Sequence, residues 1–353
     1  MYALFKEEVF LEKVVTTHNN QQAAHENNPN LPATPGTPPD LTGQGTWDKL
    51  RALFKSFRPR QWTKNFAVFV GLIFSQQLLN ITALERTTVA FVAFCLASSS
   101  IYLLNDLMDL EKDKQHPVKR LRPLASGKLP VTWAIIAMGL LVLCCGALTL
   151  ALFRIPIIQP DIYSSIGGAN VLFALSIVAY LLLMVMYSLH LKHVVLIDVF
   201  IIASGFVLRT LGGTVAIPVH VSPWLLMVAC LLSLFLALGK RRNELVLLQG
   251  QASHHRRILQ EYSIPMLDQM ITVVVAATVM AYSLYTIEGP TGDHRLIVTV
   301  PCVIYGIFRY LYLVYMKKEG GSPEEVLLRD RHIFATVLIC VVAVIAVLYL
   351  LPK

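Results

Sequence analysis

Charged residues are scarce in this sequence. They make up 15% of its 353 residues, whereas hydrophobic residues make up 55% and the mean hydropathy is +0.60. A soluble domain is usually about one quarter charged, so this chain has too few charges to cover a soluble globule of its size. The same composition excludes a disordered chain, a collagen and a disulfide-linked scaffold. What remains is a membrane protein with several spanning segments.

The sequence also lacks the motifs of several other protein classes. Its six cysteines lie in apolar runs without the spacing of a metal site or a disulfide framework, which indicates buried, reduced thiols. It has neither a Walker phosphate loop nor a dinucleotide fingerprint, and we expect no nucleic-acid partner. His190 and His193 lack a cysteine or acidic partner at a matching spacing. They are therefore interpreted as interfacial side chains rather than as zinc ligands.

The amino-terminal residues differ in composition from the rest. The stretch 18–45 is rich in Asn, Gln, Pro and Thr and has no apolar periodicity, which predicts disorder. Residues 1–15 lack the uninterrupted apolar core of a secretion signal. We therefore expect a disordered cytoplasmic tail at 1–46 and a membrane domain at 47–353.

Nine apolar runs follow the tail. Each is long enough, at about 17–24 residues, to cross about 30 Å of hydrocarbon as a helix. The alternating strands of a membrane β-barrel, about ten residues each, are not the pattern here. We predict an all-α polytopic bundle of nine transmembrane helices. They lie near 62–79, 87–104, 131–153, 169–189, 194–217, 223–239, 269–287, 296–316 and 333–351.

The basic residues predict the orientation of these spans. With a cytoplasmic amino terminus, the cytoplasmic side holds 24 of the 30 Lys and Arg residues and the other side holds 4. This asymmetry agrees with the positive-inside rule. The long polar loops, 105–130 and 240–268, then also face the cytoplasm. We expect a multi-pass protein of the inner (plasma) membrane whose active site faces the cytoplasm.

Three aspartates at the end of the second run form the candidate chemical centre. Asp106, Asp109 and Asp113, here called the acidic cluster, are spaced i, i+3 and i+7, which places them on one face of a helix. Mg²⁺ would stabilise such a cluster, because it takes oxygen ligands and bridges carboxylates to substrate phosphates. The alternative is a solvated acidic helix end paired with neighbouring lysines.

Basic residues follow the acidic cluster directly. Lys119, Arg120 and Arg122 are suited to bind the phosphate oxygens that a metal ion leaves free. The positive-inside rule alone also predicts basic residues in such a loop, but it does not explain their position beside three carboxylates.

Together these residues resemble a known family. The segment Asn105-Asp-x-x-Asp109-x-x-x-Asp113, followed by Lys119-Arg120-x-Arg122-Pro123, is similar to the first motif of the UbiA prenyltransferase superfamily. Two further segments, Arg58-Pro-Arg-Gln-Trp62-Thr-Lys64-Asn65 and Tyr187-Ser188-x-x-Leu-Lys192, resemble the same family, and the similarity runs in order from about residue 55 to the end.

One segment departs from the usual family pattern. Where typical members carry a second acidic motif, this chain has the basic run Gly239-Lys240-Arg241-Arg242-Asn243-Glu244. This resembles the branch that uses phosphoribosyl diphosphate as donor and a polyprenyl phosphate as acceptor. The charges of this donor agree with the basic run, because the donor carries a phosphate on the far side of the ribose in addition to its diphosphate. One metal motif plus a separate basic site suits that shape.

The resemblance implies a reaction and a set of site residues. The protein would transfer 5-phosphoribose to a decaprenyl-type phosphate, as a step toward a lipid-linked arabinofuranosyl donor for cell-envelope glycans, and we leave open whether it forms a homo-oligomer. Mg²⁺ would be held by Asp106 and Asp109, with Asp113 and Asn105 assisting. The substrate-binding candidates are Lys64, Asn65, Lys119, Arg120, Arg122, Tyr187, Lys192, Asp198, Lys240, Arg241 and Glu244.

Asp198, Arg209 and Arg309 lie inside predicted spans and need partners, because an isolated charge there costs at least ~2.5–3.5 kcal/mol. Asp198 and Arg209 lie about 16 Å apart along a helix and cannot pair with each other. Asp198 could join the metal or orient Lys192, and Arg209 could meet a carbonyl or be structural. The tyrosines around Arg309 indicate that it is a structural residue, either in a cation–π contact or snorkelling to the interface.

Two other functions remain open. A prenyltransferase would move a polyprenyl group from its diphosphate to an aromatic acceptor. A transporter would use Asp198 and Arg209 to line a path, but such proteins often contain inverted repeats, and no convincing internal repeat is visible.

Overall fold

The computed structural model describes residues 45–350 except 117, 166, 249–260, 290–293, 318–320 and 322. These residues form helices and no strand, which confirms the all-α class. The predicted tail at 1–46 lies outside the described residues except for its last two positions. The α-helices run over α2 Thr46–Ser56, α3 Phe69–Phe74, α4 Ile81–Met108, α5 Leu110–Gln115, α6 Val131–Ala151, α7 Asp161–Ser165, α8 Ala169–Leu189, α9 Ile197–Ala216, α10 Pro223–Leu248, α11 Ile264–Glu288, α12 Val300–Tyr312, α13 Pro323–Arg329 and α14 Arg331–Ile345.

Shorter helical segments extend or connect these helices. The 3₁₀ segments are η2 Pro59–Val68, η3 Lys119–Leu121, η4 Leu152–Arg154, η5 Leu191–His193 and η7 His294–Thr299, and the π-helical segments are η8 Leu313–Lys317 and η9 Ala346–Leu350.

Eight helices in the described part of the chain are long and apolar enough to cross a membrane. They coincide with the last eight of the nine predicted runs, and the helix predicted at 169–189 has those same bounds in α8. The first run, 62–79, is different: it forms η2 and the short α3. Its polar start explains this difference, because the Trp62 side chain donates to Ser99 and the Asn65 side chain donates to Ser98, which fixes this segment against α4.

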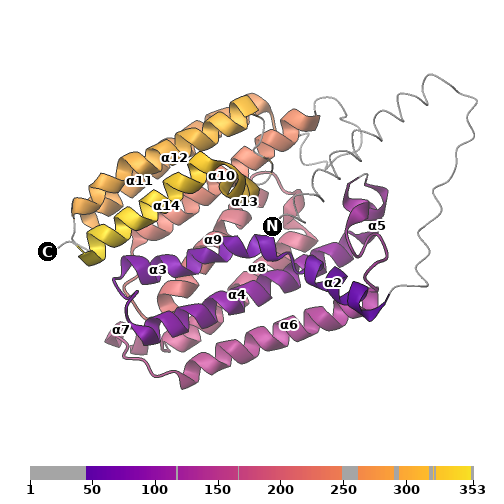
Figure 1. Ribbon diagram of the computed structural model, residues 1–353, viewed down its shortest axis with the longest axis horizontal. Coiled ribbons are helices and arrows are strands. Elements are labelled where there is room, and N and C mark those ends of the chain that lie inside the picture. Colours follow the sequence, from indigo (N-terminus) through magenta and orange to yellow (C-terminus); the bar gives the residue numbers. More distant parts are fainter. Residues whose placement is uncertain are drawn as a thin grey trace, which may run out of the picture. The chain divides into compact units, whose positions relative to one another are not determined.

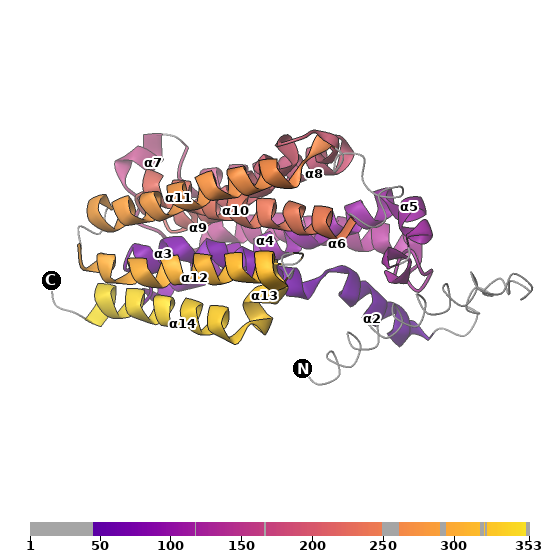
Figure 2. The same cartoon turned by 90° about the horizontal axis from the view of Figure 1, so that it is seen from above.

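Helices α4 and α9 form the interior of the bundle. In each, 61% of the most apolar stretch is buried, against 28% in α6, α8 and α14. Helix α9 packs against α8, α10, α3 and η2, while α4 packs against α6, α8 and η2. Figure 1 shows α6 along one edge of this arrangement, and Figure 2 shows the α12–α14 pair at an edge.

Side-chain caps fix the start of three long helices. Asn80 begins α4 by accepting a hydrogen bond from the Ala83 amide, and Ser263 begins α11 in the same way. Asp330 caps α14 through the Ile333 amide. These bonds satisfy amides that have no partner inside the helix.

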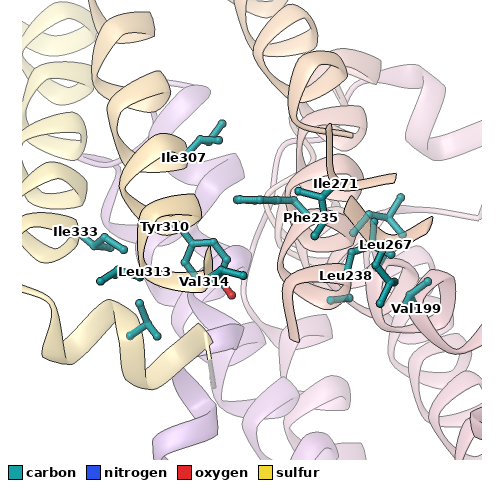
Figure 3. Packing of buried hydrophobic residues seen from close by; sticks show 14 of the residues in the cluster. Val199, Phe235, Leu238, Leu267, Ile271, Ile307, Tyr310, Leu313, Val314 and Ile333 are labelled. Carbon is teal, nitrogen blue, oxygen red and sulfur yellow. The ribbon is translucent and has the colours of Figure 1, made fainter. Parts of the chain in front are cut away.

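The largest apolar cluster joins α12 and α14 to α9, α10 and α11. The rings of Phe235 and Tyr310 pack edge to face across this boundary, with their centroids 5.2 Å apart. Figure 3 shows Ile307, Leu313 and Ile333 around Tyr310, opposite residues of α10 and α11. The cluster therefore attaches the last hairpin to the inner helices.

A glycine allows η2 to approach α9. A Cβ on Gly213 would overlap the carbonyl oxygen of Val68, which ends η2. We expect Gly213→Ala to destabilise the protein by about 1–3 kcal/mol, the usual effect of overpacking a close contact. Unfolding of the purified protein in detergent would measure this difference.

Gly146 provides the matched control, because it lies on α6 and a Cβ there meets nothing within 4 Å. Gly146→Ala should be neutral, or stabilising by up to about 1 kcal/mol through helix propensity. Equal stability of the Gly213 and Gly146 variants would contradict the close packing of η2 on α9.

Candidate active site

The acidic cluster lies where the chain leaves α4. Helix α4 ends at Met108 and α5 begins at Leu110, so Asp109 stands between two helices, with φ −93° and ψ 8°. The sequence analysis treated the three aspartates as one helical face. In the structure Asp106 and Asp113 share a partner, whereas Asp109 has a different one.

Arg122 joins the first and last aspartates. Its Nη1 atom lies 3.2 Å from Oδ1 of Asp106 and 2.5 Å from Oδ2 of Asp113. Both carboxylates are buried, while the Arg122 side chain is about one third exposed. Two carboxylate oxygens from different turns therefore converge on one cationic nitrogen.

A second arginine, Arg58, pairs with the carboxylate of Asp106. Nη2 of Arg58 lies 2.5 Å from Oδ1 of Asp106, and its guanidinium stacks over the ring of Tyr102. Arg58 has φ +53°, a left-handed conformation that is uncommon for a residue other than glycine. Such backbone strain is often found at functional sites.

Asp109 pairs with a lysine from another part of the chain. The Nζ atom of Lys192 lies 2.9 Å and 3.1 Å from the two carboxylate oxygens of Asp109. Lys192 is buried on η5, between α8 and α9. The cluster is thus neutralised by Arg58, Arg122 and Lys192, two of which are distant in sequence.

These residues fit a magnesium ion. Mg²⁺ is usually bound through one or two carboxylates, with water and substrate phosphates completing the shell, and Asp106 and Asp113 already direct oxygens to a common point. Within the described ranges, no three His, Cys, Asp or Glu side chains gather in a way that could hold a metal. An ion here would therefore use two protein carboxylates and take further oxygens from water or substrate.

A second ion-pair network, here called the Asp198 network, consists of Asp198, Arg241, Glu244 and Tyr262. Asp198 is 0% exposed and accepts hydrogen bonds from Nε of Arg241 at 2.7 Å and from the Tyr262 hydroxyl at 2.7 Å. Arg241 also contacts Glu244 at 2.5 Å. Asp198 therefore does not orient Lys192 directly, as the sequence analysis had considered, because Lys192 pairs with Asp109.

Arg209 and Asn65 have structural partners. Arg209 donates to the Asn65 side-chain carbonyl at 2.6 Å and to the Tyr180 hydroxyl at 2.7 Å. The amide of Asn65 donates in turn to Cys95 and Ser98. Asn65, a substrate-binding candidate, is fully buried. Its hydrogen bonds hold η2 to α4 and α9.

The other candidates occupy loops and helix ends. Lys64 lies on η2, Lys119 and Arg120 on η3, and Lys240 near the end of α10. Arg120 is exposed, whereas the three lysine side chains are half-buried. Tyr187 lies near enough to Arg241 to interact with it electrostatically, so α8 and α10 bring two predicted residues together. Asn105 belongs to the last turn of α4.

Sequence reasoning did not select two residues that the structure places in these networks. Arg58 was noted within a motif but was not chosen, and its position before Pro59 predicts an extended backbone rather than the left-handed one observed. Tyr262 gave no signal, because its partner Asp198 is 64 positions away in the sequence.

Arg309 confirms the cation–π prediction and adds an ion pair. Its guanidinium lies 5.1 Å from the centre of the Tyr312 ring and 2.7 Å from Oδ2 of Asp330. The hydrogen bond from Arg309 holds the pKa of Asp330 below its usual value. This pair links α12 to the start of α14.

Comparison with known proteins identifies relatives over most of the chain. The sequence model of the UbiA prenyltransferase family matches residues 65–324. A decaprenyl-phosphate phosphoribosyltransferase from Corynebacterium glutamicum is 33% identical over 308 residues, covering 85% of this chain and 87% of that protein. The enzyme of the same name from Mycolicibacterium smegmatis is 33% identical over 299 residues, covering 79% and 86%.

Solved structures share the fold at lower identity. A UbiA homolog from Archaeoglobus fulgidus bound to DMAPP and Mg²⁺ has a TM-score of 0.60 and 16% identity, covering 85% of this chain and all of that one. A digeranylgeranylglyceryl phosphate synthase has a TM-score of 0.58 and 21% identity, covering 84% and 99%. These similarities show the helical fold.

Proposed function

The chain belongs to the UbiA prenyltransferase family, and from this premise we propose that it transfers 5-phosphoribose from phosphoribosyl diphosphate to a decaprenyl-type polyprenyl phosphate. The observation that carries this proposal is the 33% identity, over 85% of the chain, to a decaprenyl-phosphate phosphoribosyltransferase. It favours this reaction over prenyl transfer to an aromatic acceptor. The basic run at the end of α10, in place of a second acidic motif, supports the same donor.

We propose Mg²⁺ as the cofactor, held by the converging carboxylates of Asp106 and Asp113. Asp109, which the sequence analysis placed beside Asp106 as a main ligand, and Asn105 would assist. When bound, the ion supplies Lewis-acid stabilisation of the departing diphosphate. Arg122 is bound to Asp106 and Asp113 in the structure. The donor diphosphate competes with these carboxylates for the guanidinium, so that Arg122 passes from protein to substrate as the donor binds.

The remaining candidates divide between the two anionic ends of the donor. Lys64, Lys119, Arg120 and Lys192 bind the diphosphate together with Arg122. Lys240 and Arg241 serve the phosphate at the far side of the ribose, with Asp198 and Glu244 fixing Arg241. Tyr187 assists from α8, near Arg241. Asn65 positions η2, and through it Lys64.

The acceptor needs no strong base. Its phosphate oxygen is already anionic and attacks the anomeric carbon from the face opposite the diphosphate. A carbon–oxygen bond to the lipid phosphate forms as the bond to the diphosphate breaks, and the diphosphate keeps the electron pair. The apolar tail of the lipid extends into the bilayer.

We further propose a plasma-membrane protein of nine spans with a cytoplasmic amino terminus and a cytoplasmic site. The excess of basic residues on the side that includes the acidic cluster supports this orientation. The span added to the eight long helices, which is the first in the sequence, would be η2 and α3 together. A 3₁₀ helix rises about 2.0 Å per residue and an α-helix about 1.5 Å, so residues 59–74 reach roughly 29 Å by these rises, near the thickness of the hydrocarbon.

The test is incubation of purified protein with Mg²⁺, labelled phosphoribosyl diphosphate and polyprenyl phosphates of several lengths, followed by lipid extraction. Label should enter the lipid fraction only when both the metal and the lipid phosphate are present. Consumption of a polyprenyl diphosphate with an aromatic acceptor, and none of phosphoribosyl diphosphate, would contradict the proposal.

Lys240→Gln should raise the KM for phosphoribosyl diphosphate by roughly tenfold, because a charge-assisted hydrogen bond contributes about 1.5–3 kcal/mol. A donor analogue without the 5-phosphate should be affected far less. Steady-state kinetics with both donors measures the difference. Equal effects on the two donors would remove Lys240 from the 5-phosphate site.

A further inference from the structure

The short connection between η5 and α9 contains a strained turn. Leu196 has φ +66° and ψ −43°, and the Ile197 amide donates to the Val195 carbonyl at 2.8 Å. This is the rare form of γ-turn, in which the central residue has positive φ. A β-carbon makes this conformation unfavourable, so it persists where surrounding contacts fix it.

The turn is held by Tyr262, which lies just before α11. The hydroxyl of Tyr262 accepts a hydrogen bond from the Leu196 amide at 2.8 Å and donates one to Oδ1 of Asp198 at 2.7 Å. Asp198 is fixed in turn by Arg241. One hydroxyl thus connects the strained residue to a buried ion pair.

The surroundings of the Tyr262 hydroxyl keep it able to accept from the Leu196 amide and donate to Asp198. Tyr262 is 5% exposed. Burial, together with its hydrogen bond to Asp198, raises the pKa of its phenol, so the group stays protonated and continues to donate to the carboxylate. Its ring packs with Val199 and Leu267 in the largest apolar cluster, which fixes the direction of the hydroxyl.

Lys192 lies on η5, the segment just before this turn. The ammonium of Lys192 reaches both oxygens of Asp109, and η5 connects to the turn through two residues. Relaxation of Leu196 to a negative φ would redirect the chain between η5 and α9. The position of Lys192 beside the acidic cluster therefore depends on the turn.

We propose that Tyr262 is a positioning residue: its hydroxyl locks the Leu196 turn and so holds Lys192 against Asp109 at the acidic cluster. Its importance for catalysis rests on the proposed function, whereas its effect on Lys192 does not. The proposal assigns Tyr262 no contact with the donor or the acceptor. It acts through Lys192.

The first test measures the reactivity of Lys192 without substrate. Purified protein is treated with an amine-acylating reagent, and labelling of Lys192 is followed by peptide mass spectrometry relative to the exposed Lys114. Tyr262→Phe removes both hydrogen bonds and keeps the ring, so labelling of Lys192 should rise about fivefold or more, as expected for the loss of a buried hydrogen bond.

Tyr282→Phe is the matched control. The Tyr282 hydroxyl is also buried and bonded, to Thr299 at 2.6 Å, but it lies in the second half of α11, away from the turn. This variant should leave the labelling of Lys192 unchanged. Labelling as slow in Tyr262→Phe as in the native protein would overturn the proposal.

A second variant tests the turn itself. Glycine adopts positive φ without strain, so Leu196→Gly should keep Lys192 protected, and adding Tyr262→Phe should raise labelling less than in the native background. The same rise in both backgrounds would mean that Tyr262 does not act through Leu196.

Kinetics then relate the turn to the reaction. Tyr262→Phe should raise the donor KM several-fold, and should have no further effect in a Lys192→Ala background. Additive effects would contradict positioning through Lys192. If labelling changes as expected but no phosphoribosyl transfer occurs in any form, the proposed function is wrong and the positioning role stands.

Discussion

Replacing Asp106 with Asn should lower turnover by at least about a hundredfold while leaving the protein folded. Asp106 is the carboxylate on which Arg58 and Arg122 converge, and it shares Arg122 with Asp113. Loss of a ligand of the proposed Mg²⁺ would remove several kcal/mol of charge stabilisation at the leaving group, and each 1.4 kcal/mol is a factor of ten in rate. Initial rates at saturating Mg²⁺ and donor measure the effect.

Glu111→Gln is the control for this variant. Glu111 lies on α5 in the same acidic segment, but it is exposed and pairs with Lys114 at 2.7 Å. Removing its charge should change the rate by less than about twofold, because exposed ion pairs contribute little. Near-native turnover in Asp106→Asn would show that the acidic cluster is not the metal site.

The sequence predicted the long helices well because each is defined by its own residues. An apolar run of about 20 residues has to form a helix in a membrane, and α8 and α14 follow this rule closely. The first run instead forms a 3₁₀ segment and a short α-helix, because η2 begins with polar side chains that bond to α4, across 30 to 37 positions of sequence.

The site was predictable in its residue types but not in its pairings. The acidic cluster and Arg122 are close together in the sequence, so their common role could be inferred. The partners Lys192 and Arg58 are brought to it by the packing of α4 against η2 and α8. No local pattern could have shown that Asp109 receives Lys192 while Asp106 and Asp113 share Arg122.

The same limitation applies to Asp198. From the sequence it needed a partner, and metal binding or orientation of Lys192 were the alternatives. Its actual partners are Arg241, in the second half of α10, and Tyr262, just before α11. Helix α10 packs against both α9 and α11, and this packing brings the two partners to the buried carboxylate.

This compensation predicts a large effect on stability. Arg241→Gln removes the cation from Asp198, whose side chain is 0% exposed, while Arg241 itself is 3% exposed. Breaking one partner of a buried ion pair usually costs about 3–5 kcal/mol, because the other charge stays buried without compensation. We expect the free energy of unfolding in detergent to fall by about this amount.

The double variant Asp198→Asn/Arg241→Gln identifies the cause. It removes both charges and leaves two amides that can bond to each other and to Tyr262, so much of the lost stability should return, because replacing a whole buried pair is often neutral. Lys114→Gln, which breaks the exposed pair with Glu111, should change stability by less than about 1 kcal/mol. If the double variant is as unstable as Arg241→Gln, the uncompensated carboxylate is not the source of the loss. Arg241 would then stabilise the end of α10 mainly through Glu244, 2.5 Å away.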